Sequence, residues 1–422
     1  MSAAIQGAKR FININGLPLE GKITNFYYYE SLLSPYVTAN FTYIDTGNSI
    51  SANKEDDPQN RLGTIRSALP LRGGELVDFK FSTSLGDLIY KKNKLVVDGS
   101  VLLSQESQRE GVLVKLLSPL YVENMKTRVQ EKFYNNTADS VRKIITQHLK
   151  VGQDKLDIDS TKTSYAFNGA NRHPFDVLVD LASKSTPPEG DPGYFIFETK
   201  SGLHFKSIDN LIKRGPKPNI PTYTYNAAFT SDRRNDSNAY RILTPPDKRD
   251  QSISESLRAG MYSATFIYMH PKESSWKTVS YKLDDKKQST LGRPVSFNPT
   301  LADKPSRIYN LVIPEGMMDQ GISDNKNNNP VDYLARAVMR YNLLFVQSMN
   351  ILIPCNPNLE AGDVIRCEFE KVTVDSKVQG SFDIPSSGDY LILNLCHYYG
   401  TTESYTSLTL VRDTYGNKGV VG

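Results

Sequence analysis

The chain has 422 residues, of which 39% are apolar, so we expect two to four domains rather than one core. Its 50 basic and 46 acidic residues leave a net charge of +4, too small and dispersed to indicate a nucleic-acid groove. No apolar span is long enough to cross a membrane, and residues 1–10 lack the apolar core of a signal peptide. We therefore expect a protein folded in a cytoplasm, without membrane insertion.

The numbers of cysteine and tyrosine residues indicate the redox state of the protein and the kind of surfaces it forms. Cys355, Cys367 and Cys396 are an odd number without metal-type spacing, which indicates reduced, buried thiols rather than a disulfide framework. Tyrosine is in excess, with 24 residues against one tryptophan. Its ring packs while its hydroxyl meets a polar partner, so this excess favours half-buried strand faces and subunit contacts.

The amino-terminal part alternates between apolar and polar residues. The alternation is clearest over residues 37–43 and 77–82, and shorter strand-like runs follow at 95–97 and 101–103. Residues 48–60 are rich in Asn, Asp, Ser and Lys, which predicts a long surface loop. Residues up to about 130 are therefore predicted to form an antiparallel barrel.

The pattern changes to helical spacing after residue 130. Thr137 is a plausible N-cap of a helix that reaches Leu149, and Pro174 suits the first turn of a second helix. Two strands follow at 194–199 and 203–208, separated by a turn in which a glycine can take a positive φ. These elements predict a small α+β unit.

The last part mixes strands, loops and one long helix. Short strand-like runs occur at 263–269 and 308–313, and residues 325–329 form a predicted loop. Residues 331–347 carry an apolar stripe at helical spacing, formed by Leu334, Val338, Tyr341 and Phe345. Alternating residues near 365–370 and 391–395 then predict closing strands without a catalytic group.

Three segments resemble one known family. Residues 171–178 and 193–211 are similar to the helix and the Phe-x-Glu-Thr hairpin of the baseplate central hub proteins of contractile-tailed bacteriophages, which adapt the tail tube to the spike. Residues 257–266 resemble the family's Gly-Met-Tyr segment, and residues 359–412 resemble its closing strands. The matched pieces cover roughly half of the chain, and the first hundred residues match only in general character.

The resemblance implies an α+β, mainly β fold with two antiparallel tube-type β-barrel domains and two smaller mixed α+β domains. Residues 1–130 would form the first barrel and 131–225 an α+β domain with two helices and a hairpin. Residues 226–250 with 348–422 would form the second barrel, and 251–347 an inserted mixed domain that ends in the long helix. The two barrels are expected to be similar in three dimensions despite unrelated sequences.

The resemblance also implies a structural role and no enzyme. The family forms a homotrimer, a ring with pseudo-sixfold symmetry that joins the sixfold tail tube to the threefold central spike and lines the channel for genome ejection. The implied partners are the central spike, the tail tube and other baseplate wedge proteins, in a virion tail assembled in the host cytoplasm. Genomic DNA would pass without specific binding, so we expect an acidic or neutral lumen, because lysines and arginines would hold its phosphates.

Two sequence patterns would instead indicate an enzyme. Asp45-Thr46-Gly47 has the local signature of an aspartic protease, but only one copy is present, and the same residues commonly end a strand in a turn. A cell-wall hydrolase needs two nearby carboxylates, and no acid stands out among the 46. A baseplate-associated cell-wall hydrolase and a host-binding tail adhesin stay as alternatives, and no catalytic residue is assigned.

The sequence assigns no metal, cofactor or nucleotide site either. Its histidines are scattered without a metal-binding pair: His148, His173, His204, His270 and His397. His148 lies on the apolar stripe of its helix, which is typical of a core or interface residue. Cys396 and His397 are adjacent in a predicted strand and therefore point to opposite faces. No phosphate-binding glycine loop occurs.

Three short basic clusters complete the candidates. They are Lys91-Lys92-Asn93-Lys94, Lys248-Arg249 and Lys286-Lys287. A solvated surface is the expected role of each, and contact with another subunit or with the spike is the alternative.

Overall fold

The structure is a computed structural model, and it describes most of the chain. The described residues are 8–19, 21–47, 50–51, 62–63, 65, 71–106, 108–134, 136–225, 239–271, 274–283, 291, 299–312, 330–371 and 382–414. The predicted loop at 325–329 and the pair Lys286-Lys287 lie outside them. Of the predicted loop 48–60, only the short strand β5 (Ile50–Ser51) is described, paired with β6 (Leu62–Gly63).

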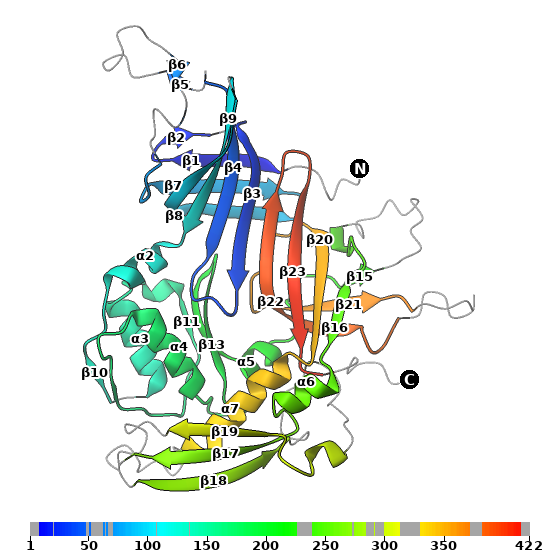
Figure 1. The fold of residues 1–422 in the computed structure, drawn as a ribbon. Coiled ribbons are helices and arrows are strands. Elements are labelled where there is room, and N and C mark those ends of the chain that lie inside the picture. The colour runs from blue at the N-terminus through cyan, green and yellow to red at the C-terminus, as the bar shows by residue number, and fades with distance from the viewer. Residues whose placement is uncertain are drawn as a thin grey trace.

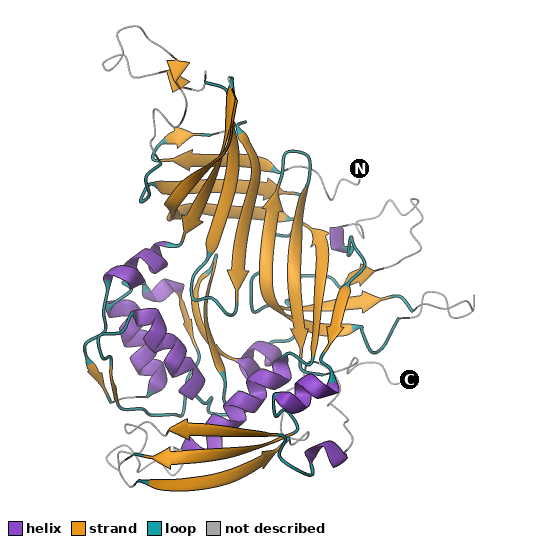
Figure 2. Cartoon of the chain, in the orientation of Figure 1, coloured by secondary structure: helices purple, strands orange, loops and turns teal. Residues whose placement is uncertain are grey.

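One long sheet dominates the fold (Figures 1 and 2), and the protein is α+β and mainly β as predicted. Its thirteen strands follow the order β16-β20-β23-β22-β3-β4-β9-β8-β7-β1-β2, with β21 and β15 branching from β22. Their bounds are β1 Lys9–Ile14, β2 Leu17–Pro18, β3 Ile23–Ser31, β4 Thr38–Asp45, β7 Leu76–Thr83, β8 Gly86–Glu106, β9 Arg109–Leu117, β15 Tyr223–Tyr225, β16 Asp247–Asp250, β20 Gln347–Pro354, β21 Val364–Phe369, β22 Gly388–Tyr399 and β23 Ser404–Arg412.

The two ends of the chain meet inside this sheet. Strand β3 pairs antiparallel with β22, from Ser31 opposite Asn394 to Phe26 opposite Tyr399. The inward side chains of both ends form one apolar core, in which the Phe26 ring lies 4.4 Å from that of Phe81 and 6.2 Å from that of Tyr399. For the neighbouring strand β4 the sequence predicted the inward phase correctly, since Phe41 is fully buried.

The prediction of two separate barrels needs correction. The described strands of both ends belong to one open sheet, and no closed barrel forms among them. The reason is the pairing of β22 with β3, which uses the strand edges that a separate amino-terminal and carboxy-terminal barrel would each need for closure.

A helical unit packs beside the sheet, with its own apolar core. Both predicted helices and the predicted hairpin are present. The elements are α2 Pro119–Lys126, β10 Lys132–Phe133, α3 Thr137–Gln147, β11 Leu156–Ile158, β12 Phe167–Asn168, α4 Pro174–Lys184, β13 Tyr194–Thr199, β14 Gly202–Ser207 and α5 Ile208–Lys213. Asn136, rather than the predicted Thr137, caps α3, because its side chain accepts the Ala138 N–H.

The predicted glycine turn of the hairpin is confirmed. Gly202 has φ +146°, and a Cβ there would lie 2.3 Å from the carbonyl oxygen of Lys155. Glycine is therefore required both by the backbone conformation and by the close approach of the preceding segment.

A third unit is a three-stranded sheet packed on a long helix. It contains α6 Ile253–Arg258, β17 Ser263–His270, β18 Ser275–Lys282, β19 Arg307–Val312 and α7 Pro330–Leu344. Figure 1 shows α7 running from this small sheet back to the long one. The helix ends at Leu344, three residues before the predicted end, because Gln347 already pairs with β16 and β23. Phe345, predicted on the apolar stripe, is 37% exposed beyond the helix end.

No helix among the described residues is long and apolar enough to cross a membrane.

Candidate functional site

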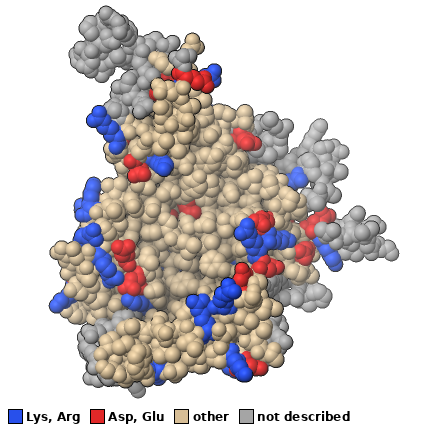
Figure 3. All heavy atoms as spheres, in the orientation of Figure 1, with Lys and Arg blue, Asp and Glu red and all other residues tan. Residues whose placement is uncertain are grey.

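The outward face of the long sheet is broad and nearly uncharged. Along β3, β4, β22 and β23 the inward side chains are buried, and those between them face outward. Apart from Ile44 and Cys396, the outward side chains are mainly hydroxyls, amides and phenols: Tyr27, Tyr29, Asn40, Thr42, Asn394, Tyr398, Tyr405, Ser407 and Thr409. Figure 3 shows few charged side chains over the central part of this face.

Four tyrosines cross the junction of the two chain ends on this face. The ring of Tyr27 lies 6.3 Å from that of Tyr29 and 4.9 Å from that of Tyr398, which in turn lies 4.5 Å from Tyr405. Partial burial raises the pKa of Tyr29, Tyr398 and Tyr405. These phenols therefore stay neutral at physiological pH, and the face presents rings and hydroxyl groups without charge.

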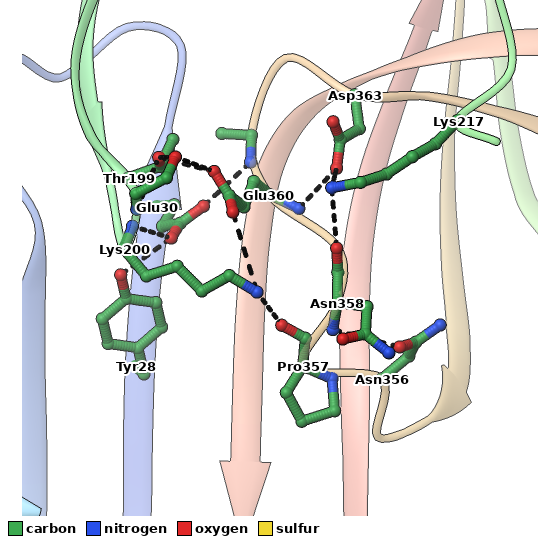
Figure 4. A network of polar contacts seen from close by, with 12 residues as sticks. Tyr28, Glu30, Thr199, Lys200, Lys217, Asn356, Pro357, Asn358, Glu360 and Asp363 are labelled. Atoms are coloured by element: carbon green, nitrogen blue, oxygen red, sulfur yellow. Dashed lines mark hydrogen bonds and ion pairs between the residues drawn. The ribbon is translucent and has the colours of Figure 1, made fainter. Parts of the chain in front are cut away.

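Behind this face, a buried carboxylate joins three segments of the chain. Glu30 on β3 is 2% exposed, and its oxygens accept the N–H groups of Lys200 at 2.8 Å and Ala361 at 2.9 Å and the hydroxyl of Tyr28 at 2.7 Å. The Tyr28 hydroxyl also lies 2.7 Å from that of Tyr90 on β8. One side chain thus holds together the long sheet, the β13–β14 hairpin and the loop before β21 (Figure 4).

The loop between β20 and β21, residues 355–363, supplies the other half of this joint. Glu360 accepts the Thr199 hydroxyl at 2.7 Å, and Lys200 donates to the carbonyl of Pro357. Lys217 donates to Asp363 at 2.7 Å, which fixes the end of the loop (Figure 4). We call the set Tyr28, Glu30, Thr199, Lys200, Lys217, Pro357, Glu360, Ala361 and Asp363 the joint network.

Burial sets the protonation of two carboxyl groups in this region. It raises the pKa of Glu30 to about 8, although three hydrogen bonds favour the carboxylate. It also raises the pKa of Glu198 on β13 to about 7, against hydrogen bonds from the Val37 N–H at 2.9 Å and the Ser118 hydroxyl at 2.8 Å. Both groups therefore take up protons on folding near neutral pH.

We expect the free energy of unfolding to fall as the pH rises from 6.5 to 8. A carboxyl group whose pKa is raised on folding contributes stability that is fully present below its unfolded-state pKa of 4.5. This stability is lost as the pH rises through the folded-state pKa, which is about 8 for Glu30 and about 7 for Glu198. The buried His397, with its pKa lowered to about 3, contributes the opposite slope, but only below its ordinary value of 6.5. The free energies of unfolding that urea titrations give at pH 6.5 and at pH 8 should differ by roughly 2 kcal/mol.

The control for this pH dependence is the double variant Glu30→Gln and Glu198→Gln, which carries no titrating group at either position. Its stability should change little between pH 6.5 and pH 8, whatever its absolute value. An equally steep fall in the double variant would contradict the assignment of the slope to these two residues.

A cavity of about 400 Å³ lies between the sheet and the helical unit. Its wall includes Tyr90, Leu95, Leu120, Glu198 and Leu203. The lysines at its rim have partners, since Lys94 pairs with Asp78 at 3.3 Å and Lys150 with Glu123. Apolar walls and paired lysines are typical of an imperfectly filled seam between two packed units.

A second buried charge cluster fixes the long helix. Arg340 of α7 is 1% exposed and donates through Nε to Asp209 of α5 at 3.1 Å and through Nη1 to Asp413, just past β23, at 2.9 Å. Burial acts most strongly and lowers the pKa of Arg340, but the two carboxylates together outweigh it, so the pKa of the arginine is raised. The three units of the fold meet at this arginine.

Asp45, the catalytic candidate of the sequence, has the contacts of a residue that stabilises a turn. Asp45 is buried at the end of β4, where its carboxylate accepts the N–H groups of Gly47 and Ile65, the turn role expected from the sequence. Among the described residues, no group of three or more His, Cys, Asp and Glu side chains is placed to hold a metal ion.

Four of the five histidines make the following individual contacts. His148 lies 3.4 Å from Glu131, and His173 faces the carbonyl of Asn124 at 2.9 Å. His204 stacks on Phe197, and buried His397 contacts the Thr406 hydroxyl at 2.8 Å. As predicted, His397 and Cys396 point to opposite faces of the strand, with His397 buried and Cys396 half-buried. Burial raises the pKa of Cys355 to about 12, which marks an unreactive thiol.

The described basic clusters lie in different structural environments. Lys94 is paired with Asp78, as described above, whereas Lys248 and Arg249 form the middle of the edge strand β16. Lys248 lies over the Phe369 ring at 4.6 Å. This cluster is therefore part of the sheet rather than a loop.

The sequence interpretation missed Glu30 and Arg340, although both carry a signal. Glu30 follows Phe26 and Tyr28 in the inward phase of β3, and Arg340 lies four residues before the buried Leu344 on α7. A charged residue in the buried phase of an element predicts a buried partner, and the partners themselves lie far away in the sequence.

The comparisons with known proteins rest on structure. No protein-family model and no curated protein matches the sequence. The 43 kDa tail protein of prophage MuSo2 from Shewanella oneidensis is similar over 96% of this chain and 98% of that chain, with a TM-score of 0.55 and 10% identity. The tail protein from Neisseria meningitidis MC58 is similar over 97% and 98%, with a TM-score of 0.55 and 10% identity. The predicted likeness to phage tail proteins is therefore confirmed at the level of the fold.

Proposed function

We propose that this protein is a structural subunit of a phage tail, the hub of the baseplate. The observation that carries the proposal is the likeness to two solved tail proteins over nearly the full length of both chains. The candidate site supports it, because the described residues offer a broad sheet face and rigid joints between units rather than a set of groups arranged for catalysis.

In this proposal three copies form a ring that joins a sixfold tail tube to a threefold central spike. Each copy would contribute two tube-type halves, residues 1–130 and residues 226–250 with 348–422, so that three copies give six similar positions. Residues 131–225 and 251–347 would form the smaller accessory domains. The partners are the spike, the tube and the wedge proteins, and the place is the tail baseplate, assembled in the host cytoplasm.

We further propose that the uncharged face of the long sheet lines the channel. Phenols, hydroxyls and amides offer no fixed charge to the phosphates of a duplex, so DNA would pass without being held. The exposed cations of the outward phase that the structure describes include Arg109 and Lys115 of β9 and Arg249 of the edge strand β16. Arg109 and Arg249 are paired with Glu106 and Asp247, so these cations do not make a continuous basic stripe.

Light scattering and electron microscopy of the full-length protein test the ring. We expect particles with the mass of three chains, seen end-on as rings with a central hole. Particles with the mass of one chain at every concentration would contradict the proposal. Incubation with purified peptidoglycan tests the alternative of a cell-wall hydrolase, and release of soluble fragments that is lost on mutating one carboxylate would favour the enzyme.

A further inference from the structure

We propose that strand β16 of one copy pairs with the open edge of β8 in the next copy and extends the long sheet from subunit to subunit. This inference rests on the proposed ring and specifies which strands form its contacts. Three observations support it. The two halves of the long sheet repeat the same strand pairing, the edges of β8 and β16 lack partner strands among the described residues, and β3 already pairs with β22 in the proposed way.

The two halves of the long sheet repeat the same four-strand pattern. The order β4-β9-β8-β7 in the first half corresponds to β20-β23-β22-β21 in the second. Each half has a bulge at the same place, between Val97 and Gly99 in β8 and between Ile392 and Asn394 in β22. The bulges align the strands residue by residue, since Val97 and Ile392 then occupy equivalent positions.

The loops before β7 and β21 confirm this alignment independently. Gly74 donates its N–H to Val97 O at 2.8 Å, and Gly362 donates to Ile392 O at 2.9 Å. Val97 in turn donates to Glu75 O at 2.8 Å, and Ile392 donates to Asp363 O at 2.9 Å. The two halves therefore share hydrogen bonds as well as strand order, which supports the predicted likeness of the two chain ends.

The alignment makes β3 and β16 equivalent strands. Asn40 and Asn350 hold the same position in β4 and β20, because their partners in β9 and β23 are aligned by the bulges. Tyr27 pairs with Asn40, and Asp247 pairs with Asn350. Counting along both strands, Tyr28 matches Lys248, Tyr29 matches Arg249 and Glu30 matches Asp250. The acidic side chain of the joint network thus has an acidic counterpart in β16.

Strand β3 has a second partner, whereas β16 has none among the residues that the structure describes. The other edge of β3 pairs with β22, in which Cys396 lies opposite Tyr29 and His397 opposite Tyr28. By the same alignment, the segment of β8 equivalent to this part of β22 is Ser100–Leu102. A repeat of the β22–β3 pairing would place Arg249 of one copy opposite Val101 of the next.

Both edges lack a partner strand in the described part of the chain. Beyond Val96, β8 pairs with β9 on one side only among the described residues, and it exposes three consecutive apolar side chains, Val101 by 46%, Leu102 by 38% and Leu103 by 56%. All four side chains of β16 are exposed, and the strand pairs only with β20 in the described part of the chain. An apolar edge strand of this kind is a template for pairing with another chain unless a partner covers it.

The contact uses two different surfaces, so each copy can offer one edge to each neighbour. Such a head-to-tail interface produces a ring when the rotation between copies closes. If β16 had no partner strand, its charged side chains would protect a free sheet edge against unwanted pairing. Cross-linking between copies distinguishes this protective role from pairing with β8.

Cysteine cross-linking of the full-length protein tests the pairing. In a Cys396→Ser background, Val101→Cys is combined with Arg249→Cys, and a second pair combines Leu102→Cys with Lys248→Cys. The control combines Val101→Cys with Ser407→Cys, an exposed residue on the same face but two strands away from β16. After oxidation with glutathione disulfide, matched pairs should yield about tenfold more disulfide-linked dimer and trimer than the control, because a disulfide requires closely spaced Cα atoms.

Light scattering of the same samples before oxidation separates the possible failures. Trimers in which neither matched pair cross-links above the control would overturn the β8–β16 pairing and leave the proposed ring intact. Monomers in every sample would overturn the ring, and the pairing with it. Trimers with efficient cross-links at both matched pairs are the result that we expect.

Discussion

Replacing Arg340 by methionine should lower the free energy of unfolding by about 3–5 kcal/mol, because the change leaves buried carboxylates without their counter-charge. Asp209 and Asp413 are each at most 1% exposed, and both accept from this guanidinium. Methionine fills much of the same volume, so loss of the charge rather than a cavity dominates the effect. Urea unfolding at pH 7 measures the change.

Arg336→Met is the matched control on the same helix. Arg336 pairs with Asp191, and its own side chain is 43% exposed whereas that of Asp191 is 9% exposed, so this pair is only partly removed from water. We expect a loss of about 1–2 kcal/mol, clearly smaller than that of Arg340→Met. Equal losses in the two variants would show that Arg340 contributes no more than a surface ion pair.

Replacing Glu30 by alanine should lower the free energy of unfolding by about 2–4 kcal/mol, because buried donors lose their acceptor. The N–H groups of Lys200 and Ala361 and the hydroxyl of Tyr28 all donate to the carboxyl oxygens of Glu30. We therefore expect the β13–β14 hairpin to separate more often from the long sheet. Hydrogen exchange should become faster at the amides of Lys200 and Ala361.

Glu360→Ala provides the comparison for Glu30. Glu360 accepts the side-chain hydroxyls of Thr199 and Ser201, which can rotate toward other partners. Its removal should leave the two backbone amides protected. If Glu360→Ala accelerates exchange at Lys200 and Ala361 as much as Glu30→Ala does, the central role of Glu30 is wrong.

Sheet-edge pairing connects these local predictions to assembly. Glu30 lies on β3 at the junction with β22, and its equivalent Asp250 lies on β16 at the proposed junction between copies. The single chain already shows how such a junction is stabilised: the buried acid Glu30 accepts the backbone N–H of Ala361 in the loop before β21. The corresponding loop of the first half contains Gly73, whose N–H is held by Glu75 at 3.0 Å in the single chain.

Local sequence patterns determined most elements correctly. The two-residue period located β4, β7 and β21, and Pro174 marked the start of α4. These signals are reliable because they depend on neighbouring residues: an alternating strand has one dry face, and a proline fits the first turn of a helix. The hairpin of β13 and β14 was equally predictable, since its turn requires glycine at position 202.

The partner of each strand was decided only by the tertiary structure. Periodicity shows which side of β3 is buried, but it does not show that Ser31 pairs with Asn394, 363 residues away. For this reason the sequence predicted two separate barrels where the two ends share one open sheet. The joint at Glu30 and the cluster around Arg340 were hidden for the same reason, because each brings together side chains from segments that only the packing of the units makes neighbours.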